Sequence, residues 1–330
     1  MDNQLFKAFV VRERKENDFH SSVEEKLVKD LPEGDLLIKV HYSSLNYKDA
    51  LSASGNKGVT RYYPHTPGID AAGIVQSSSQ YNFKKGDTVI VTGRDLGMNT
   101  HGGLSEYIRV PYDWAVKLPT SLSIKDSMII GTAGLTAGLS IKTLQNNMTL
   151  KGKKAIVSGA TGGVGSFSVK LLSVLGAEVT AITGKSESED YLKSLGAAHI
   201  LDRNEFVDSD YKSLLKGSWD VAVDVVGGKV LSNILASLRY GGVIACCGNV
   251  GSPKFGTTVF PFILRANSLI GIDSANVGTE ERVDVWSMLG DNLDMKSLKN
   301  IYREIKLNQV QHELDKFLAG KIMGRVLVSM

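Results

Sequence analysis

The chain is poor in cysteine, and this scarcity excludes a whole class of extracellular folds. Its 330 residues include two cysteines, Cys246 and Cys247, which adjoin each other late in the sequence. Neighbouring cysteines seldom bond to each other, and this pair follows an apolar segment. We therefore expect two buried free thiols and no disulfide framework, which is typical of a cytoplasmic protein.

The sequence also carries no large excess of one charge. It contains neither a long apolar run nor the apolar core of an N-terminal signal peptide. The 38 lysines and arginines nearly balance the 35 acidic residues, which gives a net charge of +3. This balance gives no indication of binding to nucleic acid or to an anionic membrane. The first seven residues carry charge and no apolar core, and we expect no apolar run long enough to cross a bilayer. The expected partner is a small-molecule substrate.

Histidine is scarce, and its spacing does not suit a metal site. The six histidines lie far apart, at positions 20, 41, 65, 101, 199 and 312. Metal-binding motifs usually place two ligands within a few residues of each other. The sequence therefore predicts no metal ion.

Two domains are expected from the chain length and from the order of the apolar segments. Residues 36–42, 70–75 and 88–91 are apolar runs separated by glycine turns, which is typical of a barrel-like β domain. From residue 126 onward strands and helices alternate, which indicates an α/β fold with a doubly wound parallel sheet. The expected parallel strands are 154–158, 178–182, 198–201, 220–224, 242–246 and 268–272, with helices at 166–175, 187–195 and 229–238. The closing strand, 324–328, has no partner in that sheet, and we expect it to return to the β domain.

The most informative segment is a glycine-rich turn between a predicted strand and a predicted helix. Residues 155–157 form a short apolar run suited to a strand that is buried on both faces. Gly162 and Gly163 allow a tight turn close to a phosphate, and Gly165 allows close packing of the helix. The amide groups at the helix start suit the pyrophosphate of a dinucleotide. Ala160 stands at the first glycine position of the strict pattern, so a purely structural turn remains the alternative.

The end of the next predicted strand distinguishes between NADH and NADPH. Proteins that bind NADH usually carry Asp or Glu there, which holds the ribose 2′-hydroxyl. Here the strand runs into Thr183, Gly184, Lys185 and Ser186, with no acid at its tip. Lysine and hydroxyl side chains attract a 2′-phosphate, whereas a carboxylate repels it. The sequence therefore predicts NADPH, with an ordinary solvated Lys185 as the alternative.

Several short motifs, in order along the whole chain, resemble those of the medium-chain dehydrogenase/reductase superfamily. They are residues 67–73, 83–89, 102–107 and 131–137, together with the glycine turn. Within the superfamily the chain is most similar to the zinc-free quinone-oxidoreductase-like branch, and there to the acrylyl-CoA reductase group. The closer match rests on residues 44–50, 183–186, 191–197 and 261–265. The resemblance implies a Rossmann NADP-binding domain, 126–274, and a GroES-like β-barrel catalytic domain formed by 1–125 and 275–330.

The sequence departs from the zinc alcohol dehydrogenases of this superfamily at the positions that hold their metals. Leu45 and Asn46 stand where those enzymes have a cysteine, and Ile69 and Asp70 replace their His-Glu pair. Because no cysteine precedes Cys246, the four-cysteine zinc lobe is missing as well. Without a Lewis acid, dehydrogenation of a simple alcohol fits poorly. Hydride addition to an activated C=C bond needs less assistance.

The resemblance implies an NADPH-dependent reductase that acts on the C=C bond of a short α,β-unsaturated acyl-CoA, converting acrylyl-CoA to propionyl-CoA. In this hypothesis Asn46 donates a hydrogen bond to the thioester oxygen, on which negative charge develops. Tyr47 flanks the nicotinamide or supplies the proton, and Asp70 and Arg325 complete the site as a bidentate pair. Structural alternatives are a backbone hydrogen bond for Asn46 and packing for Tyr47. For Asp70 and Arg325 we favour a structural bridge over direct chemistry.

The resemblance also implies a set of cofactor contacts. They are Tyr47, Gly162, Gly163, Val164, Gly165, Ser166, Thr183, Gly184, Lys185, His199, Arg203, Asn249, Ile263 and Ser274. His199 takes the position of a basic residue that reaches the 2′-phosphate in close relatives, and Arg203 is nearby. A basic rim for the phosphates of coenzyme A would favour a thioester over a quinone, and the candidates for it are Lys48, Lys57, Arg61 and Arg265, which the sequence does not place together. Relatives pair through an edge strand of the cofactor domain, so a homodimer is expected.

Two other functions stay open at the level of sequence. The same hydride chemistry serves an NADPH-dependent quinone or enone oxidoreductase, which needs no place for a coenzyme A tail. A non-catalytic NADPH-sensing protein is the third possibility, and such a protein turns over no enone.

Overall fold

The computed structural model describes residues 3–207 and 212–330, and the chain divides into two compact units. Unit 1 takes the chain up to Thr132, together with Ser274–Asp291 and Met295–Met330. Unit 2 takes Ala133–Asp273 and Asn292–Asp294. The divisions thus follow Thr132 and Asp273, whereas the sequence analysis placed them after 125 and 274.

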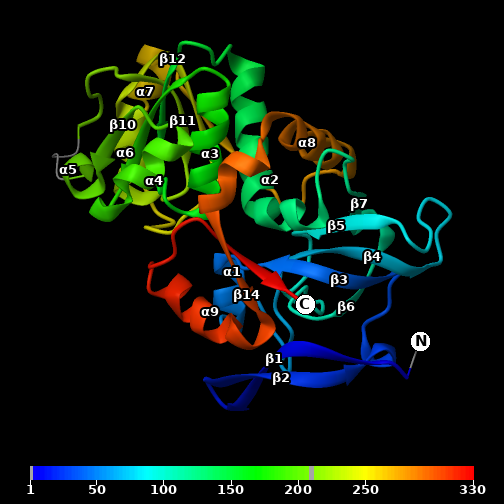
Figure 1. Cartoon of the computed structure of the whole chain (residues 1–330). Helices are drawn as coiled ribbons and strands as arrows, with labels where there is room; N and C mark the ends of the chain where they lie inside the picture. The colour runs from blue at the N-terminus through cyan, green and yellow to red at the C-terminus, as the bar shows by residue number, and fades with distance from the viewer. Residues whose placement is uncertain (1–2, 208–211) are drawn as a thin grey trace. The chain divides into compact units, whose positions relative to one another are not determined.

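Unit 2 is built on a six-stranded parallel sheet, coloured green to yellow in Figure 1. Its strands are β8 (Lys154–Val157), β9 (Glu178–Thr183), β10 (His199–Asp202), β11 (Trp219–Asp224), β12 (Leu238–Cys246) and β13 (Ser268–Gly271). They lie in the order β10-β9-β8-β11-β12-β13, so the direction of the winding reverses between β8 and β11. Ligands of doubly wound sheets bind at such a reversal, beyond the carboxyl ends of the strands.

Helices cover both faces of this sheet. They are α3 (Gly163–Val174), α4 (Glu189–Leu195), α5 (Arg203–Val207), α6 (Gly228–Ala236) and α7 (Phe260–Arg265). Right-handed crossovers leave β8 and β11 in opposite directions, which puts α3 and α6 on opposite faces. On the α6 face, Ile156, Ala222 and Ile244 of the sheet form one buried cluster with Ile234 and Leu235.

Strand β12 begins earlier than the sequence predicts. The helix expected at 229–238 ends at Ala236, and β12 starts at Leu238 instead of at 242. Gly241 has a φ of 72°, and the pairing with β11 shifts register in this part of the strand. A glycine pair is typical of a turn, and Gly241 has the positive φ of one, so the first half of the strand carries no strand signal in the sequence.

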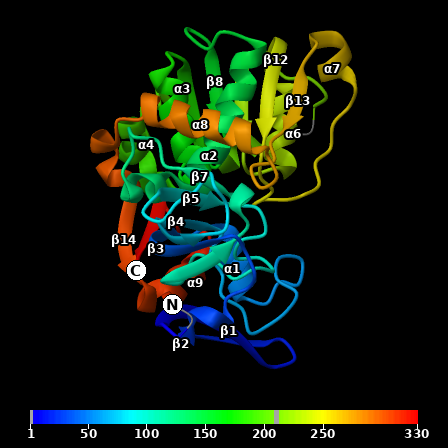
Figure 2. The ribbon, with the colours of Figure 1, turned by 90° about the vertical axis from the view of Figure 1, so that its right-hand side faces the viewer.

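Unit 1 contains a seven-stranded, mostly antiparallel sheet and a separate hairpin, which is dark blue in Figure 2. The sheet strands are β3 (Leu36–Ser44), β4 (Asp70–Ser78), β5 (Thr88–Thr92), β6 (Tyr107–Val110), β7 (Ala115–Lys117), β14 (Tyr302–Lys306) and β15 (Arg325–Ser329). The hairpin consists of β1 (Leu5–Lys15) and β2 (Asp18–Leu27), and the helices are α1 (Tyr47–Ala53), α8 (Thr279–Asn292) and α9 (Val310–Leu318). Strand β15 pairs with β3 and β14, so the closing strand returns to the β domain as predicted.

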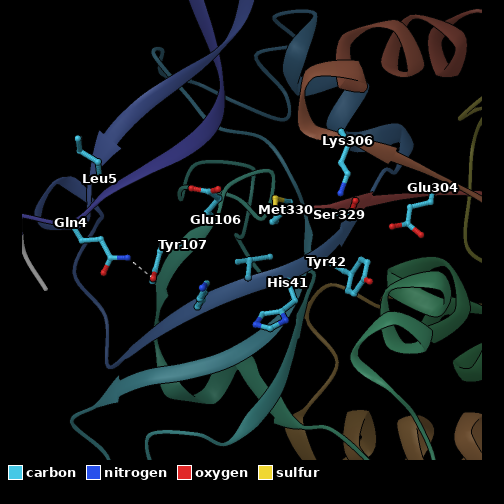
Figure 3. Close-up of a pocket in the computed structure, with 12 residues that line it drawn as sticks. Gln4, Leu5, His41, Tyr42, Glu106, Tyr107, Glu304, Lys306, Ser329 and Met330 are labelled. Atoms are coloured by element: carbon cyan, nitrogen blue, oxygen red, sulfur yellow. Dashed lines mark hydrogen bonds between the residues drawn. The ribbon is translucent and has the colours of Figure 1, made fainter.

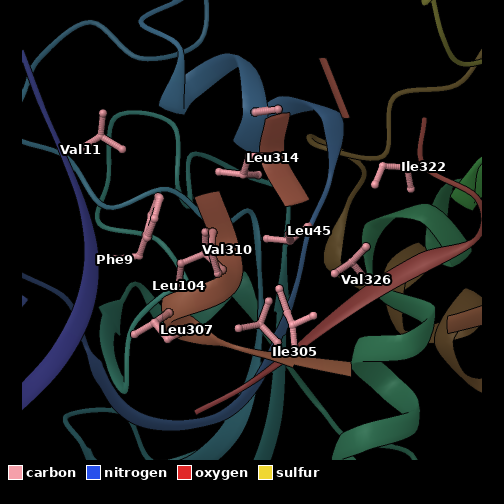
Figure 4. Close-up of a cluster of buried hydrophobic side chains, with 12 residues drawn as sticks. Phe9, Val11, Leu45, Leu104, Ile305, Leu307, Val310, Leu314, Ile322 and Val326 are labelled. Carbon is pink, nitrogen blue, oxygen red and sulfur yellow. The ribbon is translucent and has the colours of Figure 1, made fainter. Parts of the chain in front are cut away.

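Apolar packing joins the C-terminal segment to the rest of unit 1 (Figure 4). Phe9 of β1 and Leu45, which follows β3, are buried with Leu314 of α9 and Val326 of β15. Burial of each such side chain stabilises the fold by about 1.5–3 kcal/mol. Because Leu45 directly precedes Asn46, this cluster fixes the start of α1.

Helix α2 (Ile124–Asn147) contains the division between the units and is bent at Gly131, which has a φ of 53° and a ψ of −161°. A Cβ atom at this position would lie 2.5 Å from Asp70 Oδ2 and from Arg325 Nη2, and 2.6 Å from Ser44 Oγ. Only glycine therefore fits, both for its backbone conformation and for the space available.

Helix α2 is also long and apolar enough to cross a membrane by length and composition, contrary to the expectation from sequence. Its 24 residues include a window with a mean hydropathy of 1.2, and 83% of that window is buried inside the protein. Core helices of globular proteins pass the same test. The burial accounts for the composition without a bilayer.

Acid is expected to destabilise unit 1 through a cluster of basic side chains. The His101 ring contacts the Lys26 ammonium, and its centroid lies 6.4 Å from that of His65. Burial and the Lys26 charge lower the pKa of His101 from 6.5 to about 3. As the pH falls, the unfolded chain therefore binds this proton before the folded protein does. Stability is lost as the pH falls below the unfolded pKa of about 6.5. His101→Gln is expected to make the urea midpoint less sensitive to pH between about 7 and 5, with the exposed His20→Gln as control. Equal pH sensitivity of wild type and His101→Gln would contradict this origin.

Candidate functional site

Asp70 is the centre of a buried polar network in unit 1. It lies at the start of β4 and is 0% exposed. Its carboxylate accepts hydrogen bonds from Ser44 Oγ at 2.7 Å, from Asn46 Nδ2 at 2.8 Å and from Thr132 Oγ1 at 2.5 Å. The Thr132 backbone amide donates at 3.0 Å to both carboxylate oxygens. Every lone-pair direction of Asp70 is thus used inside the protein, so this carboxylate does not contact a substrate.

Arg325 supplies the positive charge of the network and is 2% exposed. Its Nη2 atom lies 3.5 Å from Asp70 Oδ2 and 2.7 Å from Ser44 Oγ, while Nη1 donates to Asn46 Oδ1 at 3.2 Å. Two further bonds go to the Leu45 and Ile129 carbonyls. The pair joins β4, β15 and the start of α1, which is the structural bridge that the sequence analysis favoured.

Both polar side-chain atoms of Asn46 form hydrogen bonds within unit 1. Its Nδ2 donates to the Ser44 carbonyl at 3.2 Å as well as to Asp70, and its Oδ1 accepts from Arg325. Both amide hydrogens are therefore consumed within unit 1. The prediction that Asn46 donates to the thioester oxygen is wrong for this arrangement, because no donor is left. Asn46 instead positions the residue that follows it.

Tyr47 is the residue of this group that reaches solvent. It is the first residue of α1 and is 40% exposed. Among the described residues its hydroxyl has no hydrogen-bond partner, so it is available to a bound molecule. The start of α1 therefore presents the phenolic hydroxyl of Tyr47 beside a network whose polar atoms are all hydrogen-bonded.

The glycine turn of unit 2 has the shape that a dinucleotide requires. Gly159 has a φ of 57°, and Gly162 is the N-cap of α3. A Cβ atom on Gly165 would lie 2.3 Å from the Gly159 carbonyl oxygen, so the helix can approach the turn only with glycine there. The amides of Gly163 and Val164, in the first turn of the helix, have no intrahelical partner. These groups form an anion-binding helix start at the carboxyl end of β8.

Ser166 does not belong to the direct contacts of this turn. It is buried, and its backbone amide donates to the Gly162 carbonyl at 2.8 Å. Its hydroxyl donates to the Ala160 carbonyl and accepts a 2.8 Å hydrogen bond from the Tyr191 hydroxyl of α4. Since both polar groups of Ser166 are used internally, we correct its predicted role to one of holding the turn in place.

Two cations meet at the tip of β9. The Arg203 guanidinium lies over Gly184, where an added Cβ would be 2.9 Å from Nη2. Burial, opposed by Glu187 and assisted by Arg203, lowers the pKa of Lys185. The Thr183 hydroxyl accepts the Lys185 backbone amide at 3.0 Å and so fixes the loop. Like charges held together in this way fit a doubly charged phosphate.

His199 lies at the wrong end of its strand for the predicted phosphate contact. It pairs with Thr180 at the amino end of β10, whereas the β9 tip pairs with Asp202. Its Nε2 atom is 2.9 Å from Glu178 Oε1, an exposed ion pair when the imidazole is protonated. We therefore withdraw His199 from the predicted cofactor contacts, whereas Arg203 lies at the tip of β9 and stays a predicted contact.

The remaining predicted cofactor contacts lie in different parts of the chain. Asn249 is exposed in the loop after β12, and Ile263 is 68% exposed on α7. Ser274 belongs to unit 1, not to the Rossmann unit, and its carbonyl accepts a hydrogen bond from Arg282. Asn249 and Ile263 belong to unit 2, so the three predicted contacts are divided between the two units.

Two residues of the expected basic rim are engaged elsewhere. Arg265 donates to the carbonyls of Ala236, Leu238 and Leu215 at 2.5–2.8 Å. Lys57 forms a 2.7 Å salt bridge with Glu13 and covers the Tyr63 ring. Lys48 and Arg61 are exposed. The prediction for Arg265 and Lys57 is wrong, because local partners hold both cations.

The two cysteines, Cys246 and Cys247, are free, as predicted, but they are half-buried. They lie at the carboxyl end of the sheet of unit 2 beside the buried Asp224. Burial and the Asp224 charge raise the pKa of Cys247 to about 12. These thiols are therefore poor nucleophiles at neutral pH.

Four residues of the unit 1 network were not singled out as site residues by the sequence analysis. They are Ser44 and Thr132, Gly131, which leaves room for the network, and Asp49, which accepts the Asn46 backbone amide at 2.7 Å. Each lies inside a motif that supports the family resemblance, but a single sequence gives no signal that positions 70 and 132 are in contact. The contact joins residues 62 positions apart, and the chain from Asp70 to the kink of α2 forms four strands, β4 to β7.

A polar groove of about 490 Å³ lies in unit 1, where β3 changes neighbour from β6 to β15 (Figure 3). His41 and Tyr42 of β3, Lys306 of β14 and Ser329 of β15 line it. None of the predicted catalytic or cofactor residues is among its lining residues. The groove is thus separate from the Asp70 network.

The side chains at the positions of the family's zinc ligands do not fit a metal. Leu45 and Ile69 are buried apolar residues, and Asp70 is saturated by its hydrogen bonds. Within residues 3–207 and 212–330, no group of three or more His, Cys, Asp or Glu could hold an ion. We derive no step of the chemistry through zinc.

Comparisons with known protein families agree with the description of both units. Residues 163–289 match the zinc-binding dehydrogenase family, and residues 32–120 match the alcohol dehydrogenase GroES-like domain. The putative quinone oxidoreductase YhfP of Bacillus subtilis is 43% identical over 328 residues, which cover 99% of each chain. The acrylyl-CoA reductase AcuI of Ruegeria pomeroyi is 38% identical over 328 residues, with 99% of each covered.

Solved structures show the same fold. The YhdH oxidoreductase of Salmonella enterica, in complex with NADP, has a TM-score of 0.94 at 41% identity and covers 98% of this chain and 99% of its own. Bacillus subtilis YhfP, with NAD bound, has a TM-score of 0.96 at 42% identity and covers 99% of this chain and 100% of its own. The chain belongs to the medium-chain dehydrogenase/reductase superfamily, in its zinc-free branch of quinone oxidoreductases and acrylyl-CoA reductases. The predicted fold class, a Rossmann sheet with a GroES-like domain, is confirmed.

Proposed function

We propose that this protein uses NADPH to reduce the C=C bond of a short α,β-unsaturated acyl-CoA, with acrylyl-CoA as substrate and propionyl-CoA as product. The observation that carries the cofactor assignment is the Lys185 and Arg203 pair at a β9 tip that has no acid. The substrate class is supported by the name of the Ruegeria relative. The buried apolar side chains of Leu45 and Ile69, which stand at positions of the family's zinc ligands and cannot ligate a metal, support C=C chemistry over alcohol chemistry.

The chain's own residues divide the work between the two units. In unit 2 the amides of the α3 start suit the pyrophosphate, and Lys185 with Arg203 suits the 2′-phosphate. The nicotinamide supplies a hydride when it is bound. In unit 1 the Tyr47 hydroxyl is the group that can donate a proton to the α-carbon or a hydrogen bond to the thioester oxygen. Asn46, Asp70 and Arg325 hold Tyr47 in position and touch no substrate.

A quinone or enone oxidoreductase is the second candidate, because the Bacillus relative carries that name. It uses the same cofactor groups and the same Tyr47. A non-catalytic NADPH sensor is the third, and the exposed Tyr47 hydroxyl beside a fixed network argues against it.

Steady-state kinetics distinguish these three candidate functions. With NADPH, kcat/KM for acrylyl-CoA is expected to exceed that for 1,4-benzoquinone and for free acrolein by at least about tenfold, which is about 1.4 kcal/mol of transition-state discrimination. Acrolein is the matched control, since it has the same double bond without the coenzyme A tail. A quinone value equal to or above the acrylyl-CoA value would assign the second function, and no turnover with any acceptor would assign the third.

We also infer a homodimer formed through the edge strand β13. This strand ends the sheet order of unit 2 and has β12 as its one neighbour among the described strands. Val259, Ile263 and Leu264 are each more than half exposed on or beside α7, which contacts β12. Exposed apolar side chains near an open strand edge are typical of an interface. A cytoplasmic location also remains an inference, supported by the two free thiols.

A further inference from the structure

Asp49 is a buried carboxylate that the proposed chemistry does not use directly. It lies on α1, two residues after Tyr47, and is 0% exposed. Its Oδ2 accepts the Asn46 amide at 2.7 Å, while Oδ1 accepts the amides of Ile69 at 2.9 Å and Gly68 at 3.1 Å. One side chain therefore ties the first turn of α1 to the segment that leads into Asp70.

The charges that face Asp49 come from two strands. Asp70 on β4 repels it, and Arg325 on β15 attracts it. Two carboxylates thus share one buried guanidinium, so one negative charge of the cluster has no ionic partner in it. Burial and Asp70 raise the pKa of Asp49 to about 7, against the three amide hydrogen bonds that favour the ionised form.

Protonation of Asp49 changes these contacts. Both of its oxygens face N–H donors, so an added proton has no acceptor among these three contacts and competes with at least one of them. A neutral carboxyl group also accepts hydrogen bonds less strongly than a carboxylate. The Asn46 backbone, and with it the Tyr47 side chain, is then held less firmly.

We propose that Asp49 is a positioning residue whose ionised carboxylate holds the Asn46–Tyr47 turn in its productive place, so that turnover depends on the charge of Asp49. The inference rests on the proposed function in that it places Tyr47 at the reacting end of unit 1. It adds a group that no sequence motif assigned to the chemistry. Asp49 acts through Asn46 and Tyr47 and does not itself contact the substrate.

The test is the pH dependence of kcat for NADPH oxidation in wild type and in Asp49→Asn. Wild-type kcat is expected to fall by roughly tenfold between about pH 8 and pH 6. Asp49→Asn is expected to lower kcat at pH 8 by about tenfold or more, to remove the acid limb, and to leave the KM for NADPH within about twofold. Asp190→Asn, an exposed carboxylate on α4, is the matched control and is expected to retain the wild-type profile. An Asp49→Asn enzyme with the wild-type limb, or with wild-type kcat at pH 8, would overturn the proposal.

Two further provisions cover an incorrect substrate assignment and a variant that does not fold. The series uses whichever acceptor is turned over, acrylyl-CoA or benzoquinone, so a failed substrate assignment leaves the Asp49 result intact. If Asp49→Asn does not fold, carboxyl-¹³C aspartate NMR is applied to Asp224→Asn, which removes the other buried aspartate with a raised pKa among residues 3–207 and 212–330. One remaining aspartate that titrates near pH 7 is expected. Titration of every aspartate below about pH 5 would overturn the proposal.

Discussion

Replacement of Arg325 by methionine is expected to lower the free energy of unfolding by about 3–5 kcal/mol. The substitution leaves the Asp70 carboxylate buried without its cation, and it removes the donors to Ser44 and to the Asn46 side chain. An uncompensated buried charge costs far more than a lost surface pair. Urea unfolding at neutral pH measures the change.

Two variants identify the origin of this loss. Arg12→Met breaks an exposed ion pair with Glu24 and is expected to cost at most about 1 kcal/mol. Asp70→Asn combined with Arg325→Met removes both charges of the pair and is expected to regain part of the loss, because position 70 no longer carries an unpaired buried charge. A loss of less than about 1 kcal/mol in Arg325→Met would show that Asp70 is not held as an ion by this pair.

Simultaneous replacement of Lys185 and Arg203 by alanine is expected to lower kcat/KM for NADPH by at least about 100-fold and to leave the value for NADH within about threefold. Each charge-assisted bond to the 2′-phosphate contributes roughly 1.5–3 kcal/mol, and two such bonds account for the factor. Only NADPH carries that phosphate. Initial rates with both cofactors, at a fixed concentration of the best acceptor, give the ratio.

The matched control for this pair is Lys193→Ala. Lys193 is an exposed lysine on α4, paired with Glu189 at 2.6 Å. Its removal tests whether any nearby positive charge contributes to cofactor binding. We expect it to change neither kcat/KM for NADPH nor kcat/KM for NADH. Equal losses for NADPH and NADH in the double variant would exclude a 2′-phosphate role and favour the solvated reading of Lys185.

The sequence predicts the parts of this fold that rest on local apolar patterns and on glycine. The buried run before Gly159 becomes β8, and the closing strand returns to the β domain. The Asp70–Arg325 bridge was also expected, because a buried arginine needs a carboxylate and the family motifs bring the two segments together. The first two features follow from local apolar patterns and glycine turns, whereas the Asp70–Arg325 pair joins segments 255 residues apart and depended on the family resemblance.

The errors concern side chains whose partners come from distant segments. Asn46 lost its predicted role because Ser44, Asp70 and Arg325 use all of its polar atoms. His199 was assigned from the family resemblance, although the predicted strand 198–201 already places it near the amino end, away from the tip of β9. For Asn46 the decisive quantity is which hydrogen-bonding atoms remain free after folding, and only the folded arrangement determines it.

The central claim, reduction of a conjugated thioester C=C bond with NADPH, is tested most directly by isotope transfer. The protein is incubated with acrylyl-CoA and NADPH that carries deuterium at nicotinamide C4 on both faces, and the acyl product is analysed by mass spectrometry and NMR. The account predicts propionyl-CoA with one deuterium on the β-carbon and a solvent proton on the α-carbon. Unchanged acrylyl-CoA under conditions in which the same sample oxidises NADPH with benzoquinone would contradict it.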